Sequence, residues 1–383
     1  MDIQESPRIH PKDGVTKGEE ATVLISSVNV WKYVRLCGSW VLFSVKISSL
    51  TLFLIYVAVP IFVKANQWIL PKINLKHSDF ILSFLFVIIF VFVLTVHWPP
   101  FVNLSRPSDF DLNNTRNFYL HVEEGVNIGA WHILPANLQT EQRIITPDHY
   151  EDELNSGHNI FLYLTWQQGS HHRVQLYRLL SKLNYHVVTI DYRGYGDSSG
   201  YPTEDGVVAD AYFAYKWLKE KAGESKIFIW GHSLGTGVTT KLAKRLCDEG
   251  DHPAGIILES PFNNIHEAAQ NHPLGLPYRM LPWFEWVFLD GIKEHGIYFR
   301  SDENILSVTP NILILHAKDD FIVPFDLGKK LYHKARETRN HKTGQVEFIP
   351  FEASHGYGHK LIYKAPELPS LIRKFVGSTG EKM

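Results

Sequence analysis

The sequence predicts a doubly wound α/β fold, in which helices cover both faces of a mostly parallel sheet. From about residue 117 onward, short apolar stretches alternate with helical stretches, as is typical of such sheets. Most of these apolar stretches are continuous rather than apolar at every second residue, which is expected of strands buried on both faces. We predict that this domain spans residues 117–377.

The predicted elements follow a regular order along the chain. A leading hairpin turns at Glu124-Gly125, and strands and helices then alternate, with a glycine-rich loop at 192–200. The predicted strands are 118–122, 126–134, 159–164, 186–191, 226–230, 255–258, 311–316 and 345–351, and the predicted helices are 173–184, 203–221, 238–245 and 368–376. With this alternation, each loop lies either at the carboxyl ends or at the amino ends of the strands.

Residues 227–245 combine a strand, a tight turn and a helix. The turn reads Gly-His-Ser-Leu-Gly at 231–235, which is the G-x-S-x-G pattern of a nucleophile elbow. Such a turn forces strained dihedrals on Ser233, and the glycines on either side leave room for it. An ordinary strand-to-helix turn is the alternative interpretation, but the context favours a catalytic serine. The N–H of Leu234, at the start of the helix, is then one donor to an oxyanion.

An acid and a histidine base are expected after the serine, each on a loop that follows a late strand. Asp319 and Asp320 lie on the first such loop. We choose Asp320 because it lies farther out, and Asp319 is interpreted as a turn or capping residue. His355 and His359 both follow the last strand, and spacing alone does not separate them. Two glycines nearby favour a bent loop that delivers His359, which would accept the proton of Ser233 while Asp320 orients the imidazole.

The first 98 residues have a different composition. Residues 1–39 are polar over most of their length and predict a tail. The stretch 40–63 is apolar apart from Lys46, and the stretch 80–98 has no charged residue and the length of a membrane-spanning helix. We therefore predict a membrane region at 40–98 with one or two spans, the alternative being buried core helices. The surrounding positive charges do not decide the topology.

Residues 261–307 interrupt the alternation and are rich in Pro, Trp and Phe. One interpretation is a cap with its own core. The other is an apolar lid over an acyl-chain groove, and the two are compatible.

Two acceptor patterns for N-glycosylation, at Asn103 and Asn113, precede the predicted domain. They are usable only if the C-terminal domain faces a lumen or the cell exterior. We therefore favour a luminal domain.

Composition excludes several function classes. The formal net charge is −2 and the pI is about 6.9, so nucleic acid is not an expected partner. Two cysteines, Cys37 and Cys247, are too few for a metal cluster, and the sequence has no dinucleotide fingerprint. We expect neither a metal nor an organic cofactor.

These residues resemble the α/β-hydrolase domain-containing protein 12 family, membrane-bound serine hydrolases of lysophosphatidylserine and monoacylglycerol. The resemblance covers about 118–375 and is carried by the stretches 191–198, 230–238, 258–265, 316–325, 357–360 and 364–369. It implies the α/β-hydrolase fold, a triad on Ser233, Asp320 and His359, and glycosylation at Asn113. It also implies residence in the endoplasmic reticulum membrane with a luminal catalytic domain.

The sequence departs from the family pattern in two places. Members carry a His-Gly-Asn-Ala-Gly-type loop after the first central strand, which supplies an oxyanion N–H. Here Leu164 is followed by Thr-Trp-Gln-Gln-Gly at 165–169, so the second donor is expected near Trp166 or Gln167. Loss of one such donor typically costs about 10²–10³ in turnover. The run 80–98 is also longer and more hydrophobic than is usual in the family.

The function we expect is a membrane-anchored serine hydrolase that cleaves acyl esters of lysophospholipids, such as lysophosphatidylserine, and of monoacylglycerols. A lipid substrate and the membrane are the expected partners, and no obligate protein partner is implied. A weakly active or non-catalytic binding protein is the alternative, because of the altered loop after Leu164. A hydrolase of small esters or peptides is a further alternative, because triad chemistry is shared.

Overall fold

The structure is a computed structural model of the 383-residue chain. It describes residues 103–139, 146–165, 168–273, 275, 279–280, 284–285, 289–339 and 343–379. The predicted tail, the two predicted membrane spans and Trp166 lie outside these ranges. Within them, no helix is both long and apolar enough to cross a membrane. The chain divides into two compact units, 1–96 and 97–383, and the described residues all belong to the second.

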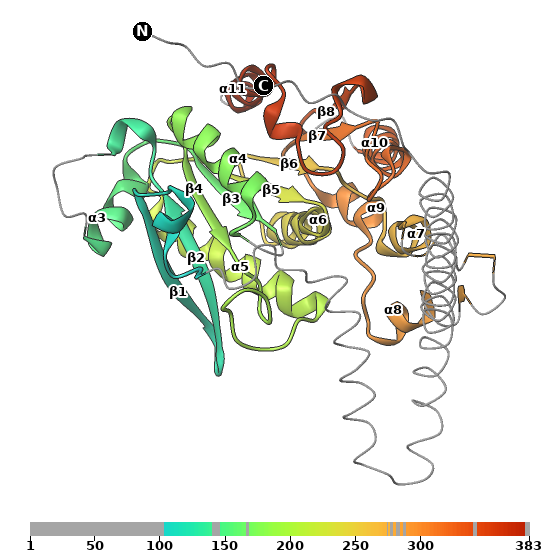
Figure 1. Ribbon diagram of the computed structural model, residues 1–383, viewed down its shortest axis with the longest axis horizontal. Coiled ribbons are helices and arrows are strands. Elements are labelled where there is room, and N and C mark those ends of the chain that lie inside the picture. The colour runs from blue at the N-terminus through green and yellow to red at the C-terminus, as the bar shows by residue number, and fades with distance from the viewer. Residues whose placement is uncertain are drawn as a thin grey trace, which may run out of the picture. The chain divides into compact units, whose positions relative to one another are not determined.

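Eight strands form one sheet in this second unit (Figure 1), in the order β1-β2-β4-β3-β5-β6-β7-β8. The first hairpin is antiparallel and joins β4 antiparallel, and all the other neighbouring strands are parallel. The strands are β1 Thr115–Glu123, β2 Val126–Ile133, β3 Ile160–Leu164, β4 His186–Ile190, β5 Ile227–His232, β6 Gly255–Glu259, β7 Asn311–Ala317 and β8 Val346–Phe351. The predicted mostly parallel sheet is thus confirmed.

Helices cover both faces of the sheet (Figure 1). The α-helices are α3 Pro147–Asp152, α4 His171–Lys182, α5 Glu204–Lys221, α6 Leu234–Asp248, α7 Ile265–Asn271, α8 Asp290–Glu294, α9 Ser301–Asn304, α10 Phe325–Thr338 and α11 Leu368–Ser378. Buried side chains of α5, α6 and α10 share one core with the sheet, and those of α4 and α11 share a second core on the opposite face. This is the doubly wound arrangement that the sequence predicts.

Strand β3 shows how continuous apolar stretches build two cores. Its residues Ile160, Leu162 and Leu164 belong to the core with α5 and α6, whereas Phe161 and Tyr163 belong to the core with α4. All five are buried, because successive side chains of a strand point to opposite faces and both faces are covered.

The chain reverses its direction across the sheet at β3. It first passes from β3 to β4 on one side and then to β5 on the other side of β3. In open α/β sheets, ligands bind at the carboxyl ends of the strands at such a switch point. The loops that follow β3 and β5 are therefore the expected location of a site.

Helix α10 is absent from the predicted elements. Its buried residues Leu327, Leu331 and Ala335 recur at every fourth position and form its inner face. Helix α6 also begins at Leu234, earlier than the predicted 238, because the turn leads directly into the helix. Both differences concern segments in which the helical pattern is mixed with turn residues.

A buried ion pair fixes the loop that follows β4. The guanidinium of Arg193 donates from Nε and Nη2 to Asp210 Oδ1 at 2.9 and 2.7 Å, and the Arg193 N–H donates to Asp210 Oδ2 at 2.8 Å. The carboxylate of Asp210, on α5, is fully buried. The pair ties the glycine-rich loop to the helix that follows it.

Replacing Asp210 should destabilise the fold much more than replacing a surface partner. We expect Asp210→Ala to lower the free energy of unfolding by about 3 kcal/mol, because Arg193 loses its buried partner and keeps only the exposed carboxylate of Glu123. Lys374→Ala breaks an exposed pair with Glu347 and should cost less than about 1 kcal/mol. Urea unfolding followed by tryptophan fluorescence measures both, and equal losses in the two variants would contradict the expectation.

Candidate active site

Ser233 lies at a sharp turn between β5 and α6. Its φ of 54° and ψ of −120° are strained for a residue with a side chain. The turn is held by backbone bonds, from Ser233 N–H to Glu259 O at 3.0 Å and from Thr236 N–H to Ser233 O at 2.8 Å. Ser233 is partly exposed although the strand that carries it is buried. These features are those of a nucleophile elbow.

The two glycines of the pattern allow α6 to approach the sheet. A Cβ on Gly231 would lie 2.4 Å from the carbonyl oxygen of Gly235 and 2.4 Å from Thr239 Oγ1. A Cβ on Gly235 would lie 2.0 Å from the carbonyl oxygen of Leu164, at the end of β3. Any side chain at 235 would therefore push the helix away from the strand, and the turn at Ser233 would open.

The structure brings His359 and Asp320 together. His359 Nδ1 lies 2.8 Å from Asp320 Oδ2, and Asp320 Oδ1 accepts the N–H groups of Ile322 and Val323 at 2.9 Å each. Burial disfavours the Asp320 carboxylate, but bonds from His316 and His359 outweigh it and hold its pKa below the usual range. An ionised Asp320 fixes the tautomer of His359 with the proton on Nδ1, which leaves Nε2 free to accept a proton.

His232, directly before the serine, holds the backbone of His359. Its Nε2 lies 2.8 Å from the carbonyl oxygen of His359, so Nε2 carries the proton and donates it. The two imidazole centroids are 4.9 Å apart. Burial and the neighbouring His359 and Arg173 keep the pKa of His232 well below its usual value, so the ring stays neutral. The contact places His359 beside the turn that carries Ser233.

Asp319 holds the other side of the same loop. Its Oδ2 accepts the N–H of Gly358 at 3.0 Å, one residue before His359. Gly358 has a φ of +48°, a conformation that favours glycine. The loop that carries His359 is therefore bonded at the Gly358 N–H and at the His359 carbonyl, by residues that directly precede Asp320 and Ser233 in the sequence.

His355, the alternative base, is in a different setting. It is exposed in a short 3₁₀ turn, Ala353–His355, and its ring stacks on Tyr357 with centroids 5.2 Å apart. Asp320 thus pairs with His359, and His355 lies on the surface.

The first residue of α6, Leu234, is the expected oxyanion donor. Leu234 is partly exposed beside Ser233, and the N–H groups in the first turn of a helix have no partner within the helix. The second expected donor, Trp166, lies outside the described residues. Beyond it, Gln168 is buried, and its N–H donates to Asp191 Oδ1 at 2.7 Å. Burial raises the pKa of Asp191 to about 7.

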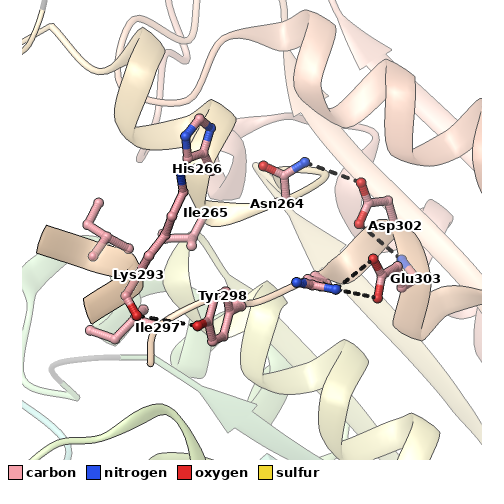
Figure 2. A pocket seen from close by; sticks show the side chains of 10 residues that line it. Asn264, Ile265, His266, Lys293, Ile297, Tyr298, Asp302 and Glu303 are labelled. Carbon is pink, nitrogen blue, oxygen red and sulfur yellow. Dashed lines mark hydrogen bonds and ion pairs between the residues drawn. The ribbon is translucent and has the colours of Figure 1, made fainter. Parts of the chain in front are cut away.

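The two arms of the insertion after β6 meet at its base. The Asp302 N–H donates to the carbonyl of Asn263 at 2.8 Å, and Asn264 Nδ2 donates to Asp302 Oδ2 at 3.2 Å. Figure 2 shows this side-chain pair across the base of a cavity of about 390 Å³ between the arms. The lining residues are Asn264, Ile265, His266, Ile292, Lys293, Ile297, Tyr298, Arg300, Asp302 and Glu303.

A buried carboxylate anchors the returning arm to the main domain. Glu204, the first residue of α5, accepts the N–H groups of Tyr298 and Phe299 and pairs with Lys241 Nζ at 2.6 Å. Phe299 is buried with a φ of 34°, and its ring packs where a Cβ on Gly237 would clash. The insertion is thereby attached to the helix that follows Ser233.

Comparison with known proteins places the chain in a family. A family model described as serine aminopeptidase, S33, matches residues 169–295. The lysophosphatidylserine lipase of Danio rerio is 47% identical over 325 residues, which is 84% of this chain and 81% of that protein. The lysophosphatidylserine lipase of Gallus gallus is 46% identical over 326 residues, with 84% and 81% covered.

The chain belongs to the α/β-hydrolase domain-containing protein 12 family. As a member of this family, it is a hydrolase of carboxylic esters. The fold agrees with this membership. A solved α/β-hydrolase of Vibrio vulnificus superposes with a TM-score of 0.53 at 18% identity, covering 73% of this chain and 87% of that one.

Sequence reasoning missed the residues that support the predicted site of this family member. His232 occupies a variable position of the G-x-S-x-G pattern, so the pattern predicts no role for it. Asp319 was interpreted only as a turn or capping residue. His316, buried at the end of β7, lies 3.3 Å from Asp320 Oδ2 and donates from Nε2 to the carbonyl of Val323 at 3.0 Å. His316 lies near the end of the strand that leads to Asp320, and this position could have predicted its contact with that carboxylate.

Asp319 should matter through the position of His359. We expect Asp319→Ala to lower kcat about fivefold with little change in KM, because loss of one hydrogen bond, about 1 kcal/mol, loosens the loop. Asp319→Asn keeps an oxygen acceptor for the Gly358 N–H and should restore most of the rate. Steady-state hydrolysis of a soluble ester by the two variants tests this.

A matched control for this experiment is Glu352→Ala, which breaks an exposed pair with Lys318 on the same face. It should leave kcat unchanged. If Asp319→Asn is as slow as Asp319→Ala, the carboxylate acts by its charge and not by positioning the loop.

Proposed function

We propose that this protein is a membrane-anchored serine hydrolase that cleaves the acyl esters of lysophospholipids, such as lysophosphatidylserine, and of monoacylglycerols. The observation that carries the proposal is the convergence of Ser233, His359 and Asp320 on the carboxyl edge of the sheet. The relatives add the substrate class, since they are named lysophosphatidylserine lipases.

The reaction follows from the roles of these side chains. Ser233 Oγ attacks the ester carbonyl carbon while His359 Nε2 takes its proton, and the N–H of Leu234 stabilises the oxyanion. His359 then gives the proton to the departing alcohol oxygen, which leaves an acyl group on Ser233. Water, deprotonated by His359, releases the fatty acid and restores the serine. Asp320 stays ionised and stabilises the imidazolium of His359 throughout.

The insertion after β6 supports a lipid substrate. Its segment 276–288 is rich in Pro, Trp and Phe, which suits an acyl chain. His272, at the end of α7, is half-buried, and burial together with His359 lowers its pKa. The end of α7, inside the insertion, is thus close enough to His359 for that ring to affect His272, as expected of a segment that covers the substrate.

The membrane anchor is inferred from composition. The stretch 80–98 has no charged residue and is long enough to span a bilayer, and 40–63 provides a second candidate span. Asn113 is exposed two residues before β1 begins, where a glycan would be tolerated. We therefore propose residence in the endoplasmic reticulum membrane, with the catalytic unit in the lumen and a glycan on Asn113.

A fluorophosphonate probe tests the proposed nucleophile. Wild-type protein in detergent should be labelled and should hydrolyse lysophosphatidylserine and monoacylglycerol, whereas Ser233→Ala should lose the label and at least about 10⁴-fold in turnover. Ser260→Ala, a buried serine after β6, is the matched control and should keep the label. A folded wild type that is not labelled would contradict the hydrolase mechanism and favour a binding protein with an altered oxyanion loop.

Glycosidase treatment tests the topology. Protein made in cells should stay with membranes after alkaline carbonate washing and should shift in mobility when treated with endoglycosidase H. Asn113→Gln should remove the shift, because the amide that accepts the glycan is gone. A wild type that is never glycosylated at Asn113, or that is released by carbonate, would contradict a luminal or membrane-anchored unit respectively.

A further inference from the structure

The chain enters the catalytic unit at the same edge of the sheet as the site. Leu104 is buried against the loops that follow β3 and β4: a Cβ on Gly169 would lie 2.6 Å from Leu104 Cδ2, and a Cβ on Gly196 would lie 3.0 Å from Leu104 Cδ1. The carbonyl oxygen of Leu104 accepts the indole N–H of Trp131 at 2.9 Å. Leu104 is therefore fixed beside the loop expected to complete the oxyanion hole.

The linker between the proposed membrane span and Leu104 is short. The apolar stretch 80–98 ends at Trp98, and only residues 99–103 separate it from Leu104. Such a segment reaches at most about 20 Å even when fully extended. A lipid surface at the end of the proposed span would therefore be within this reach of Leu104 along the chain.

Three strongly exposed apolar side chains lie in segments that leave this edge. Among the described residues, the large hydrophobic side chains with the highest exposure are Met280 at 94%, Tyr201 at 74% and Phe321 at 68%. Tyr201 lies between β4 and α5, Met280 in the insertion after β6, and Phe321 directly after Asp320. All three segments leave carboxyl ends of parallel strands. Exposed apolar groups on the loops of one functional edge suit an interaction surface.

A cationic residue accompanies the most exposed of them. Arg279 precedes Met280 and is itself exposed. An apolar side chain beside a basic one suits the boundary between phosphate head groups and acyl chains.

We propose that the carboxyl edge of the sheet is a bilayer-docking surface, on which Phe321, Met280 and Tyr201 contact the lipid. This inference rests on the proposed membrane anchor and lipid ester substrate. Phe321 directly follows Asp320, so a lipid surface in contact with Phe321 would lie next to the predicted triad. A lipid ester could then pass from the bilayer to Ser233 without crossing water. The occupant is the lipid surface itself, not a partner protein.

Lipid quenching tests the docking directly. In a Cys37→Ser, Cys247→Ser background, the full chain carries a single cysteine with a nitrobenzoxadiazole label at Met280→Cys, Tyr201→Cys or Leu306→Cys. Leu306 is 38% exposed and precedes the amino end of β7, which makes it the matched control. In phosphatidylcholine vesicles containing spin-labelled lipid, the labels at 280 and 201 should be quenched and the label at 306 should not. Equal quenching at all three positions, or none at 280, overturns the proposal.

A kinetic comparison adds an independent arm. The double variant Phe321→Ser, Met280→Ser should lose about tenfold or more in kcat/KM on monoacylglycerol presented in vesicles, because two apolar contacts with lipid are removed. Its hydrolysis of water-soluble p-nitrophenyl butyrate should be unchanged. Equal rates on the vesicle substrate for wild type and variant overturn the docking surface. Failure of the proposed function is distinct: the wild type then hydrolyses neither ester, while the quenching result still decides the docking.

Discussion

The close approach of helix α6 to the end of β3 is the constraint on which the rest of the site depends. It is a backbone-to-backbone contact, possible only because Gly235 has no side chain above the carbonyl of Leu164. It forces the sharp turn at Ser233 and aims the start of the helix at the space above β3 and β5. The strain at Ser233 is stable because the strands on both sides of β5 are buried and fully paired.

A second level of organisation connects the three loops that leave β5, β7 and β8. Neighbours of the predicted triad carry the connections: His232 bonds to the carbonyl of His359, and Asp319 bonds to the N–H of Gly358. The loop that carries His359 is thus held in place by hydrogen bonds to the loops that carry Ser233 and Asp320. Its position does not depend on substrate, which favours a preorganised site.

The fold and the sharp turn at Ser233 could be predicted from the sequence because those signals are local. Continuous apolar strands and the glycine spacing around Ser233 are written in consecutive residues. Spacing alone did not separate His355 from His359, because the distinction depends on a contact with Asp320 from a different strand. Helix α10 was missed because Gly328 interrupts its pattern. That glycine is needed where a Cβ would lie 2.2 Å from His316 Nδ1. The supporting roles of His232 and Asp319 likewise depend on partners distant in the sequence.

The anchoring of the insertion by Glu204 has a consequence for how the family can diversify. Because the two arms are bonded to each other at their base and the returning arm is bonded to Glu204, the residues between the arms can change without moving the rest of the domain. Changes in the length or composition of the insertion would then leave the strands and the loops of Ser233, Asp320 and His359 in their places. Glu204, which is remote from the reacting atoms, would thereby let the insertion vary in sequence without disturbing the loops of the predicted triad.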